Sequence, residues 1–365
     1  MRVVIAGGGL VGLTAAASLH RIGHEVTVLE QAPEIRAAGA GIGLWSNALR
    51  EFDRIGIGAD VRELGEEIDT WFFDPTGRRV RAAGFSQRDH RFLLVPRPAL
   101  NTLLADVIGR DRILLDARLS AYEDGPDGVT ARLADGRGVP GDLLIGADGV
   151  HSSVRAQLLP GFAARPHGGH YAWRAIVAAG DERPEGTVVT IGGERTRGGY
   201  ARVAAGRTMW MVNQFEAGEL TGGKRDRALS RARHLAAEGW HEDLLRMIAA
   251  TPEEAILENR IMLVPPLPRW TGRHVALIGD AAHGLSPHIA AGGTLGIEDV
   301  GELRSALTGE PDLGAALSRY EEVRRRRFDR VREFSDEVEH AVGADEFARC
   351  YAAFSHWMLT TAPVN

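Results

Sequence analysis

The feature that most constrains this chain is the glycine run in VVIAGGGLVGLTAAASL, which begins at residue 3. Residues 3–6 are apolar and either β-branched or small, which predicts a strand buried on both faces. Gly7, Gly9 and Gly12 follow in G-x-G-x-x-G spacing. In that spacing the first glycine permits a tight turn, the second lets a pyrophosphate approach the backbone, and the third lets the next helix pack on the strand.

A helix and a second strand complete this pattern. Residues 13–19 are good helix formers, and Gly23 stands where a left-handed residue commonly ends a helix. The next segment, HEVTVLE, predicts a strand that ends at Glu30. A carboxylate about twenty residues beyond the glycines accepts hydrogen bonds from ribose hydroxyls and repels a 2′-phosphate. The pattern therefore predicts a site for FAD or NAD, with a purely structural turn as the alternative.

Two later segments favour FAD over NAD. DLLIGADGVHSSVR predicts an apolar strand, a turn containing Asp148 and a helix opened by two serines. VALIGDAAHGLSPHIAAGGTLGIEDV places Asp280 at the carboxyl end of another strand, where ligands of open α/β sheets bind. A carboxylate there accepts a hydrogen bond from a ribityl hydroxyl, which NAD lacks, and the helix opened by residues 292–294 presents free N–H groups to a flavin. Taken singly, each aspartate is also compatible with capping a turn.

These three motifs, in this order, resemble those of the flavoprotein aromatic hydroxylases. These are the single-component, group A FAD-dependent monooxygenases of the para-hydroxybenzoate hydroxylase type. Two weaker segments agree, GAGIGLWSNALREFDRIGI and LVPRPALNTLL, and the resemblance runs from residue 1 to about residue 335. It implies an α/β fold in which a discontinuous Rossmann-like FAD-binding domain carries an inserted mixed β-sheet substrate domain and C-terminal helices.

The positions of the motifs predict the domain boundaries. The FAD-binding domain is expected to comprise residues 1–65, 93–161 and 271–335, with the substrate domain at 66–92 and 162–270 and a C-terminal helix and tail at 336–365. Alternation in GYARVAA and RTMWMVNQF predicts strands of the substrate sheet, and RDRALSRARHLAAEGW predicts an amphipathic helix behind it. A second G-x-G-x-x-G is absent from the sequence, so NADH or NADPH is expected to dock only transiently.

The resemblance also implies an activity. NADH or NADPH would reduce FAD, and O2 would then give a C4a-hydroperoxyflavin that hydroxylates a small aromatic or heteroaromatic substrate, with secondary metabolites among the options. Epoxidation, oxidative decarboxylation and drug inactivation on the same fold remain open alternatives, as does a non-catalytic flavin redox sensor. A halogenase is disfavoured because Lys224, the single lysine, lies far from every motif.

The resemblance assigns cofactor contacts to residues of all three motifs. Gly7, Gly9, Leu10 and Gly12 are expected at the pyrophosphate, Glu30 at the adenosine ribose, and Arg36 and Arg97 at phosphate oxygens. Asp280 is expected at the ribityl chain, Pro287 at the oxygen pocket, and Gly292, Gly293 and Thr294 at the polar edge of the flavin. Gln31, Gly43, Leu119 and Asp148 complete the predicted set.

A second set of residues is predicted to contact the substrate. The candidates are Trp45, Tyr171, Trp173, Arg197, Met209 and His288. Arg197 lies near the position of a substrate-anchoring arginine in related hydroxylases, although an exposed hairpin arginine fits equally well. The aromatic residues fit a core equally well, and His283 is expected to be structural. Catalytic candidates are Arg197, Pro287 and His288, the last as a base or hydrogen-bond partner.

Charge and composition exclude other classes. A net charge of −6 and a pI near 6.1 give no reason to expect a nucleic-acid partner. The run 324–327 of four arginines is flanked by acids, which predicts a solvated mixed-charge helix face. Cys350 is the single cysteine, so neither an intrachain disulfide nor a cysteine metal site is expected, and no metal is predicted. Since the sequence shows neither a leader nor an apolar run of the ~20 residues that cross a bilayer, we expect a cytoplasmic protein without a membrane partner, either a monomer or a homodimer.

Overall fold

The predicted strand–helix–strand unit forms the centre of a five-stranded parallel sheet in the computed structural model, which describes residues 1–35, 40–86, 89, 91–180, 187–237 and 239–361. The strand order is β17 (Val275–Leu277), β11 (Leu143–Gly146), β1 (Arg2–Ala6), β2 (Glu25–Leu29) and β7 (Ile113–Leu114). All neighbouring pairs are parallel. The carboxyl ends of four strands that are distant in sequence therefore meet at one edge of this sheet, and each predicted cofactor motif follows one of them.

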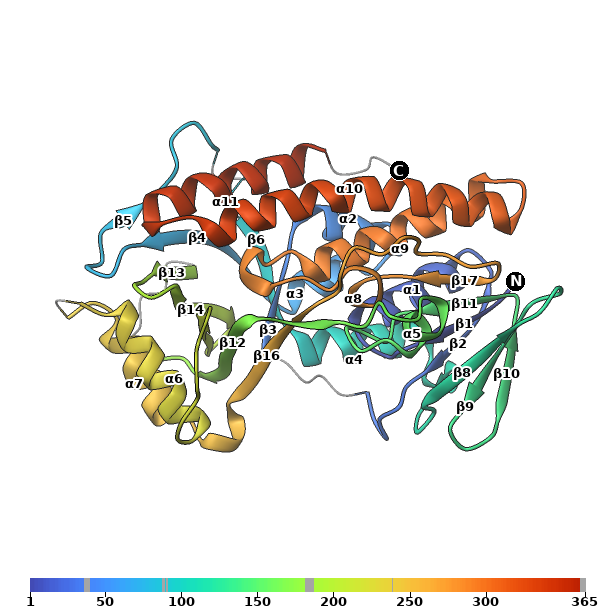
Figure 1. The fold of residues 1–365 in the computed structure, drawn as a ribbon, viewed down its shortest axis with the longest axis horizontal. Helices are drawn as coiled ribbons and strands as arrows, with labels where there is room; N and C mark the ends of the chain where they lie inside the picture. Colours follow the sequence, from blue (N-terminus) through green and yellow to red (C-terminus); the bar gives the residue numbers. More distant parts are fainter. Residues whose placement is uncertain (36–39, 87–88, 90, 181–186, 238, 362–365) are drawn as a thin grey trace.

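A nine-stranded mixed sheet forms the second half of the molecule (Figure 1). Its strands are β3 (Gly41–Leu44), β4 (Glu66–Phe73), β5 (Arg79–Val80), β6 (Arg91–Pro96), β12 (Arg165–Ala178), β13 (Thr187–Ile191), β14 (Thr196–Ala204), β15 (Arg207–Gln214) and β16 (Leu257–Leu263). The main path is β16-β12-β15-β14-β13-β4-β6-β3, and β5 pairs with β4. The predicted α/β class with an inserted mixed sheet is confirmed.

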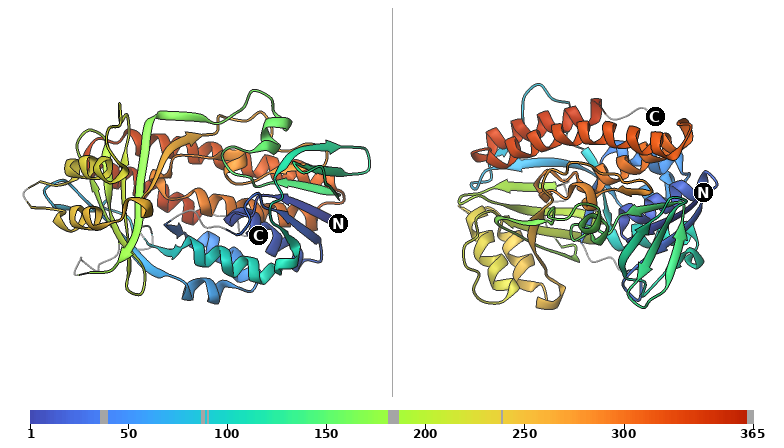
Figure 2. Two further views of the ribbon diagram at one scale, coloured as in Figure 1. Left: turned by 90° about the horizontal axis from the view of Figure 1, so that it is seen from below. Right: turned by 45° about the vertical axis from the view of Figure 1, so that its right-hand side comes forward.

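The helices pack on both halves of the molecule. They are α1 (Leu10–Arg21), α2 (Ser46–Arg54), α3 (Gly58–Glu63), α4 (Arg97–Ile108), α5 (Ser153–Leu158), α6 (Lys224–Ala232), α7 (Glu242–Ala250), α8 (Asp280–His283), α9 (Gly292–Gly309), α10 (Leu313–His340) and α11 (Gly343–Thr360). Helices α10 and α11 run side by side over the top of both halves in Figure 1. A separate antiparallel sheet, β8 (Leu119–Asp124), β9 (Val129–Leu133) and β10 (Gly138–Gly141), stands on the side opposite α6 and α7 (Figure 2).

The large sheet has two differently covered faces. One face packs Trp173, Tyr200 and Trp210 against α6 and α7, so the predicted amphipathic helix does lie behind the sheet. The other face packs Met209 and Val203 against Ala40, which precedes β3, and against Ile68 and Leu94 of β4 and β6. We call this second side the cofactor-facing surface.

The predicted domain boundaries and the observed elements differ at two places. Strands β3 and β6 contribute to the large sheet, although most of their residues fall in the segments predicted for the FAD-binding domain. Helix α10 continues to His340, so the predicted boundary before residue 336 falls inside a helix. Both differences arise because β3 and β6 pair into the large sheet through β4, and α10 continues without a break past residue 336.

The run of four arginines is not the solvated face that its flanking acids predicted. Arg325 and Arg326 do pair with acids one turn away on α10. Arg324 and Arg327, however, are 1% and 8% exposed and form ion pairs with Glu298. Glu298 lies on α9, so the pattern of charges around the arginine run on α10 could not reveal it. In the described part of the chain, no helix is both long and apolar enough to cross a membrane.

Candidate functional site

The glycine loop after β1 has the geometry that its spacing predicted. Gly7 has φ +108, a backbone conformation that side chains disfavour. A Cβ on Gly12 would lie 2.0 Å from the carbonyl oxygen of Gly7, so this position must lack a side chain for α1 to pack on the strand. A Cβ on Gly9, in contrast, would meet no protein atom within 4 Å. Packing within the protein therefore explains Gly7 and Gly12 but not Gly9, and the open space at Gly9 fits an approaching pyrophosphate.

Glu30 lies directly after β2 and turns back onto this loop. Its Oε2 accepts a hydrogen bond from the backbone N–H of Gly8 at 2.8 Å, and its Oε1 accepts one from Ala32 N–H at 2.8 Å. These two bonds hold the carboxylate beside the glycine loop, where the predicted ribose contact requires it. Leu10 begins α1 and is buried, whereas Gln31 is exposed.

Asp280 follows the carboxyl end of β17 and begins α8. Its side chain is exposed, and it forms no hydrogen bond or ion pair with any residue that the structure describes. The preceding Gly279 has φ +58, and its N–H donates to the buried carboxylate of Asp299 at 2.8 Å. The backbone is therefore fixed while the Asp280 carboxylate is left available, which fits a ribityl hydroxyl as partner.

Helix α9 begins beside Asp280. A Cβ built on Gly292 would lie 3.9 Å from the nearest protein atom, Oδ1 of Asp280, so the helix start is open on this side. Thr294 is buried, and its hydroxyl accepts a hydrogen bond from Trp45 N–H at 3.2 Å. Gly293 instead packs close to Ile42 of β3. Residues 292–294 thus place free N–H groups at the sheet edge that carries the other cofactor motifs.

Asp148 has the capping role that was the alternative to cofactor binding. Its Oδ2 accepts hydrogen bonds from Ser153 N–H at 2.7 Å and Val154 N–H at 3.2 Å, at the start of α5. Burial raises the pKa of this carboxyl, while these N–H groups oppose the shift. Its Oδ1 is buried without a partner among the described residues, so a cofactor contact through that atom stays a prediction.

For the remaining predicted cofactor contacts, the structure gives a position but no feature that points to a ligand. Arg36 lies outside the described residues. Arg97 begins α4 and is half-buried, and Pro287 is exposed at the start of the short helix Pro287–Ile289. Gly43 lies in β3, and Leu119 begins β8 with its side chain in the core. Their contacts with a cofactor remain predictions.

The structure separates the predicted substrate residues by face. Trp173 is fully buried against α6 and α7, its Nε1 donates to Glu258 at 2.6 Å, and Tyr171 stacks on it. Both aromatic residues lie on the face that α6 and α7 cover, so core packing accounts for them, and a substrate role for them stays a prediction. Met209 does lie on that surface, where its sulfur accepts a hydrogen bond from Gly41 N–H at 3.1 Å. Trp45 is core, with its Nε1 donating to the carbonyl of Ala290 at 3.0 Å.

Arg197 is neither an exposed hairpin residue nor free to hold a ligand with its whole guanidinium. It is 5% exposed, and its Nη2 donates to the carbonyls of Val338 and Glu339 at the end of α10. Its Nη1 is buried without a partner in the described residues, and burial lowers its pKa to about 10. The guanidinium therefore links β14 of the large sheet to the carboxyl end of α10.

His288 is also engaged by protein groups. Its Nδ1 lies 2.7 Å from the Ser286 hydroxyl, and its Nε2 donates to the carbonyl of Ser335 at 2.9 Å. Burial, followed by the charge of Arg197, lowers its pKa to about 4. Because both ring nitrogens are occupied, the geometry does not support His288 as a base. His283 has the expected structural role, since its Nε2 binds the buried Asp299 at 2.5 Å.

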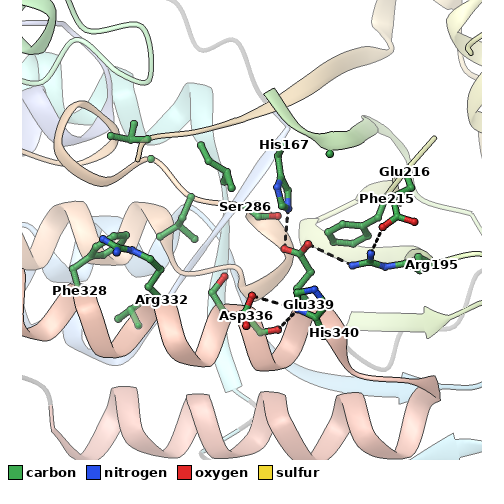
Figure 3. A pocket seen from close by; sticks show the side chains of 17 residues that line it. His167, Arg195, Phe215, Glu216, Ser286, Phe328, Arg332, Asp336, Glu339 and His340 are labelled. Atoms are coloured by element: carbon green, nitrogen blue, oxygen red, sulfur yellow. Dashed lines mark hydrogen bonds and ion pairs between the residues drawn. The ribbon is translucent and has the colours of Figure 1, made fainter. Parts of the chain in front are cut away.

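A cavity of about 400 Å³ lies behind the loop that carries Ser286 (Figure 3). Glu339 projects from α10 into it and binds His167 at 2.8 Å and Arg195 at 3.4 Å. Burial opposes ionisation of Glu339, but the hydrogen bond from His167 and the neighbouring positive charges lower its pKa to about 2. No sequence motif connects these residues, which explains why they were not predicted. Among the residues described, no group of three or more metal-ligating side chains is placed to hold a metal ion.

The fold and the strand-end site define an FAD-binding α/β protein, and comparison with known proteins gives its family. Residues 1–335 match the FAD binding domain family model, and the chain belongs to that family. It is 32% identical to the aurachin C monooxygenase/isomerase of Stigmatella aurantiaca over 98% of this chain and 92% of that protein. It is 31% identical to the FAD-dependent urate hydroxylase of Klebsiella pneumoniae over 91% of this chain and 87% of that protein.

A solved structure agrees with these relatives. The chain is similar to Klebsiella pneumoniae HpxO complexed with FAD and uric acid, with a TM-score of 0.82 and 28% identity. The match covers 98% of this chain and 93% of that one. The protein is therefore an FAD-dependent monooxygenase, and the predicted cofactor and enzyme class are confirmed.

Proposed function

We propose that this protein hydroxylates a small aromatic or heteroaromatic compound with NADH or NADPH and O2. The observation that carries the proposal is the convergence of Gly9, Glu30, Asp280 and the start of α9 at one sheet edge, opposite the cofactor-facing surface of the large sheet. A cofactor held along that edge has its flavin end against a largely apolar wall. Such a wall suits a planar aromatic substrate.

Within this proposal, the protein supplies position and environment, while FAD, when bound, supplies the redox and oxygen chemistry. The glycine loop accommodates the pyrophosphate, Glu30 and Asp280 accept hydrogen bonds from hydroxyls, and α9 presents N–H groups to the polar edge of the flavin. The apolar wall, which includes Met209 and Val203, excludes water from the reacting centre.

Relatives support the aromatic substrate class. The curated proteins similar to this chain include a 6-hydroxynicotinate 3-monooxygenase of Bordetella bronchiseptica, 30% identical over 92% of this chain, and a 3-hydroxybenzoate 6-hydroxylase of Aquipseudomonas alcaligenes, 30% identical over 93%. A chloroplastic zeaxanthin epoxidase of rice is 32% identical over 88% of this chain, but the match covers only 52% of that enzyme. Epoxidation is therefore the second candidate reaction.

The test is substrate-stimulated oxidation of NADH and NADPH by the FAD-loaded protein, with O2 uptake and product mass measured together. A panel of phenols and hydroxylated heteroaromatic acids should contain compounds that accelerate oxidation at least tenfold and gain one oxygen atom. Slow oxidation that no compound stimulates would instead indicate a redox sensor. We also propose that the enzyme is cytoplasmic and works as a monomer or homodimer. This part of the proposal rests on the sequence alone.

A further inference from the structure

Trp45 lies directly after β3 and binds two positions around the start of α9. Its backbone N–H donates a hydrogen bond to the Thr294 hydroxyl at 3.2 Å, and its indole Nε1 donates one to the carbonyl of Ala290 at 3.0 Å. These two acceptors stand on either side of the segment 291–293, which contains the first residues of α9. A single residue therefore holds this segment at both ends.

The backbone of Ala290 explains why such a bond is needed. Ala290 has φ +51, in the left-handed region that a residue with a Cβ disfavours. In a planar trans peptide the carbonyl and the N–H point in opposite directions, so a bond to the Ala290 carbonyl also fixes the direction of the Ala291 N–H. Ala291 precedes α9, and no side chain caps this helix start. The N–H groups here are therefore oriented through Trp45 rather than by a capping side chain.

The indole of Trp45 is itself held in place by aromatic packing. Its side chain is 1% exposed. The ring centroid of Phe354 lies 5.7 Å away in an edge-on arrangement, and that of Tyr351 lies 6.1 Å away. Both rings belong to α11, and Phe92 of β6 stacks on the indole at 6.4 Å. A side chain packed this closely has little rotational freedom, so its N–H has a fixed direction.

We propose that Trp45 is a positioning residue for the flavin, and that it aims the N–H groups between Ala290 and Thr294 at N1 and the C2 carbonyl of the isoalloxazine. A flavin that has taken up two electrons and one proton carries negative charge at this edge, and fixed N–H donors stabilise such charge. Because the indole is buried, it acts through the loop and favours binding of reduced over oxidised FAD. This inference rests on the proposed function, which assigns the start of α9 to the polar edge of the flavin.

The midpoint potential of the bound FAD measures this effect without turnover. Trp45→Phe keeps an aromatic ring but removes the indole N–H, and it should weaken binding of reduced FAD relative to oxidised FAD about tenfold. For a two-electron couple this ratio lowers the midpoint potential by about 30 mV. Anaerobic dye-equilibration titrations of the FAD-loaded protein, without NADH or NADPH, give the potential. Binding of oxidised FAD should change less than threefold, since the glycine loop and Asp280 are untouched.

Variants of Thr294 test the second bond, and a second tryptophan supplies the control. Thr294→Val removes the hydroxyl acceptor and should also lower the potential, whereas Thr294→Ser keeps the hydroxyl and should leave the potential unchanged. Trp210 is fully buried against α6 and α7, and its Nε1 donates to the Thr251 hydroxyl at 2.9 Å. Trp210→Phe should therefore lower the free energy of unfolding in urea, as Trp45→Phe does, but leave the midpoint potential unchanged.

An unchanged potential in either Trp45→Phe or Thr294→Val would overturn the proposal. An equal fall in Trp210→Phe would overturn it as well, because a general loss of packing would then explain the result. If Trp45→Phe does not fold, the comparison of Thr294→Val with Thr294→Ser decides. If the expected shifts are found but no compound stimulates oxidation of NADH or NADPH, the proposed function fails while the positioning role of Trp45 stands.

Discussion

Replacing Asp299 with asparagine should destabilise this protein more than most single substitutions. Asp299 is fully buried on α9 and accepts three hydrogen bonds, from Gly279 N–H at 2.8 Å, His283 Nε2 at 2.5 Å and Arg324 Nε at 2.7 Å. These bonds join β17, α8 and α10 to α9. An asparagine keeps the shape but has one acceptor oxygen, and its NH2 group must face another donor.

The magnitude follows from the charges in this buried cluster. Glu298 and Asp299 balance Arg324 and Arg327, so Asp299→Asn leaves one uncompensated buried cation. Breaking a buried ion pair by removing one partner costs about 3–5 kcal/mol. Because whole domains are stable by only about 5–15 kcal/mol, this loss is a large fraction of the total. FAD binding should weaken as well, since Asp299 fixes the backbone next to Asp280.

Urea unfolding of the FAD-free protein, followed by circular dichroism, measures the change in the free energy of unfolding. Asp329→Asn, at an exposed position on α10, is the matched control and should stay within about 0.5 kcal/mol. The double variant Asp299→Asn/Arg324→Met should lose clearly less than the sum of the two single losses, because it removes both charges of one pair. A loss below about 1 kcal/mol for Asp299→Asn, or strict additivity, would refute the reasoning.

Three further predictions concern the cofactor loop, the strand tip and acid stability. Gly12→Ala should destabilise the FAD-free protein because its Cβ would clash with the Gly7 carbonyl, whereas Gly9→Ala should leave its thermal midpoint unchanged and weaken only FAD binding in fluorescence titrations. Asp280→Ala should likewise preserve the FAD-free fold but remove a charged acceptor worth about 1.5–3 kcal/mol, and full retention of FAD would contradict the ribityl assignment. The pKa of His288 is near 4 in the folded protein against 6.5 ordinarily, so the unfolded chain binds its proton first and stability falls as pH is lowered from about 6.5 to 4. His288→Gln should reduce the slope of unfolding free energy against pH by about one bound proton over that window, and an unchanged slope would count against the assignment.

The cofactor half was predictable because its signals are local in the sequence. The glycine loop requires small residues for reasons that act within a few positions of Gly7 and Gly12, and the strand before it is apolar because both its faces are covered. Each motif also ends a parallel strand, so knowing the class of sheet is enough to bring Glu30 and Asp280 to one edge. The order of these motifs was therefore sufficient to predict the fold and FAD.

The substrate side depended on contacts that sequence patterns do not encode. The sequence did not show which face of β12 would be covered by α6 and α7, and the structure places Tyr171 and Trp173 on that covered face. Arg324 and Asp299 lie 25 residues apart on different helices, and the run of arginines looked solvated until α9 was seen to supply the acids. Only the packing of α9 against α10 decided which charged groups are neutralised in the interior, as Arg324 and Arg327 are by Glu298.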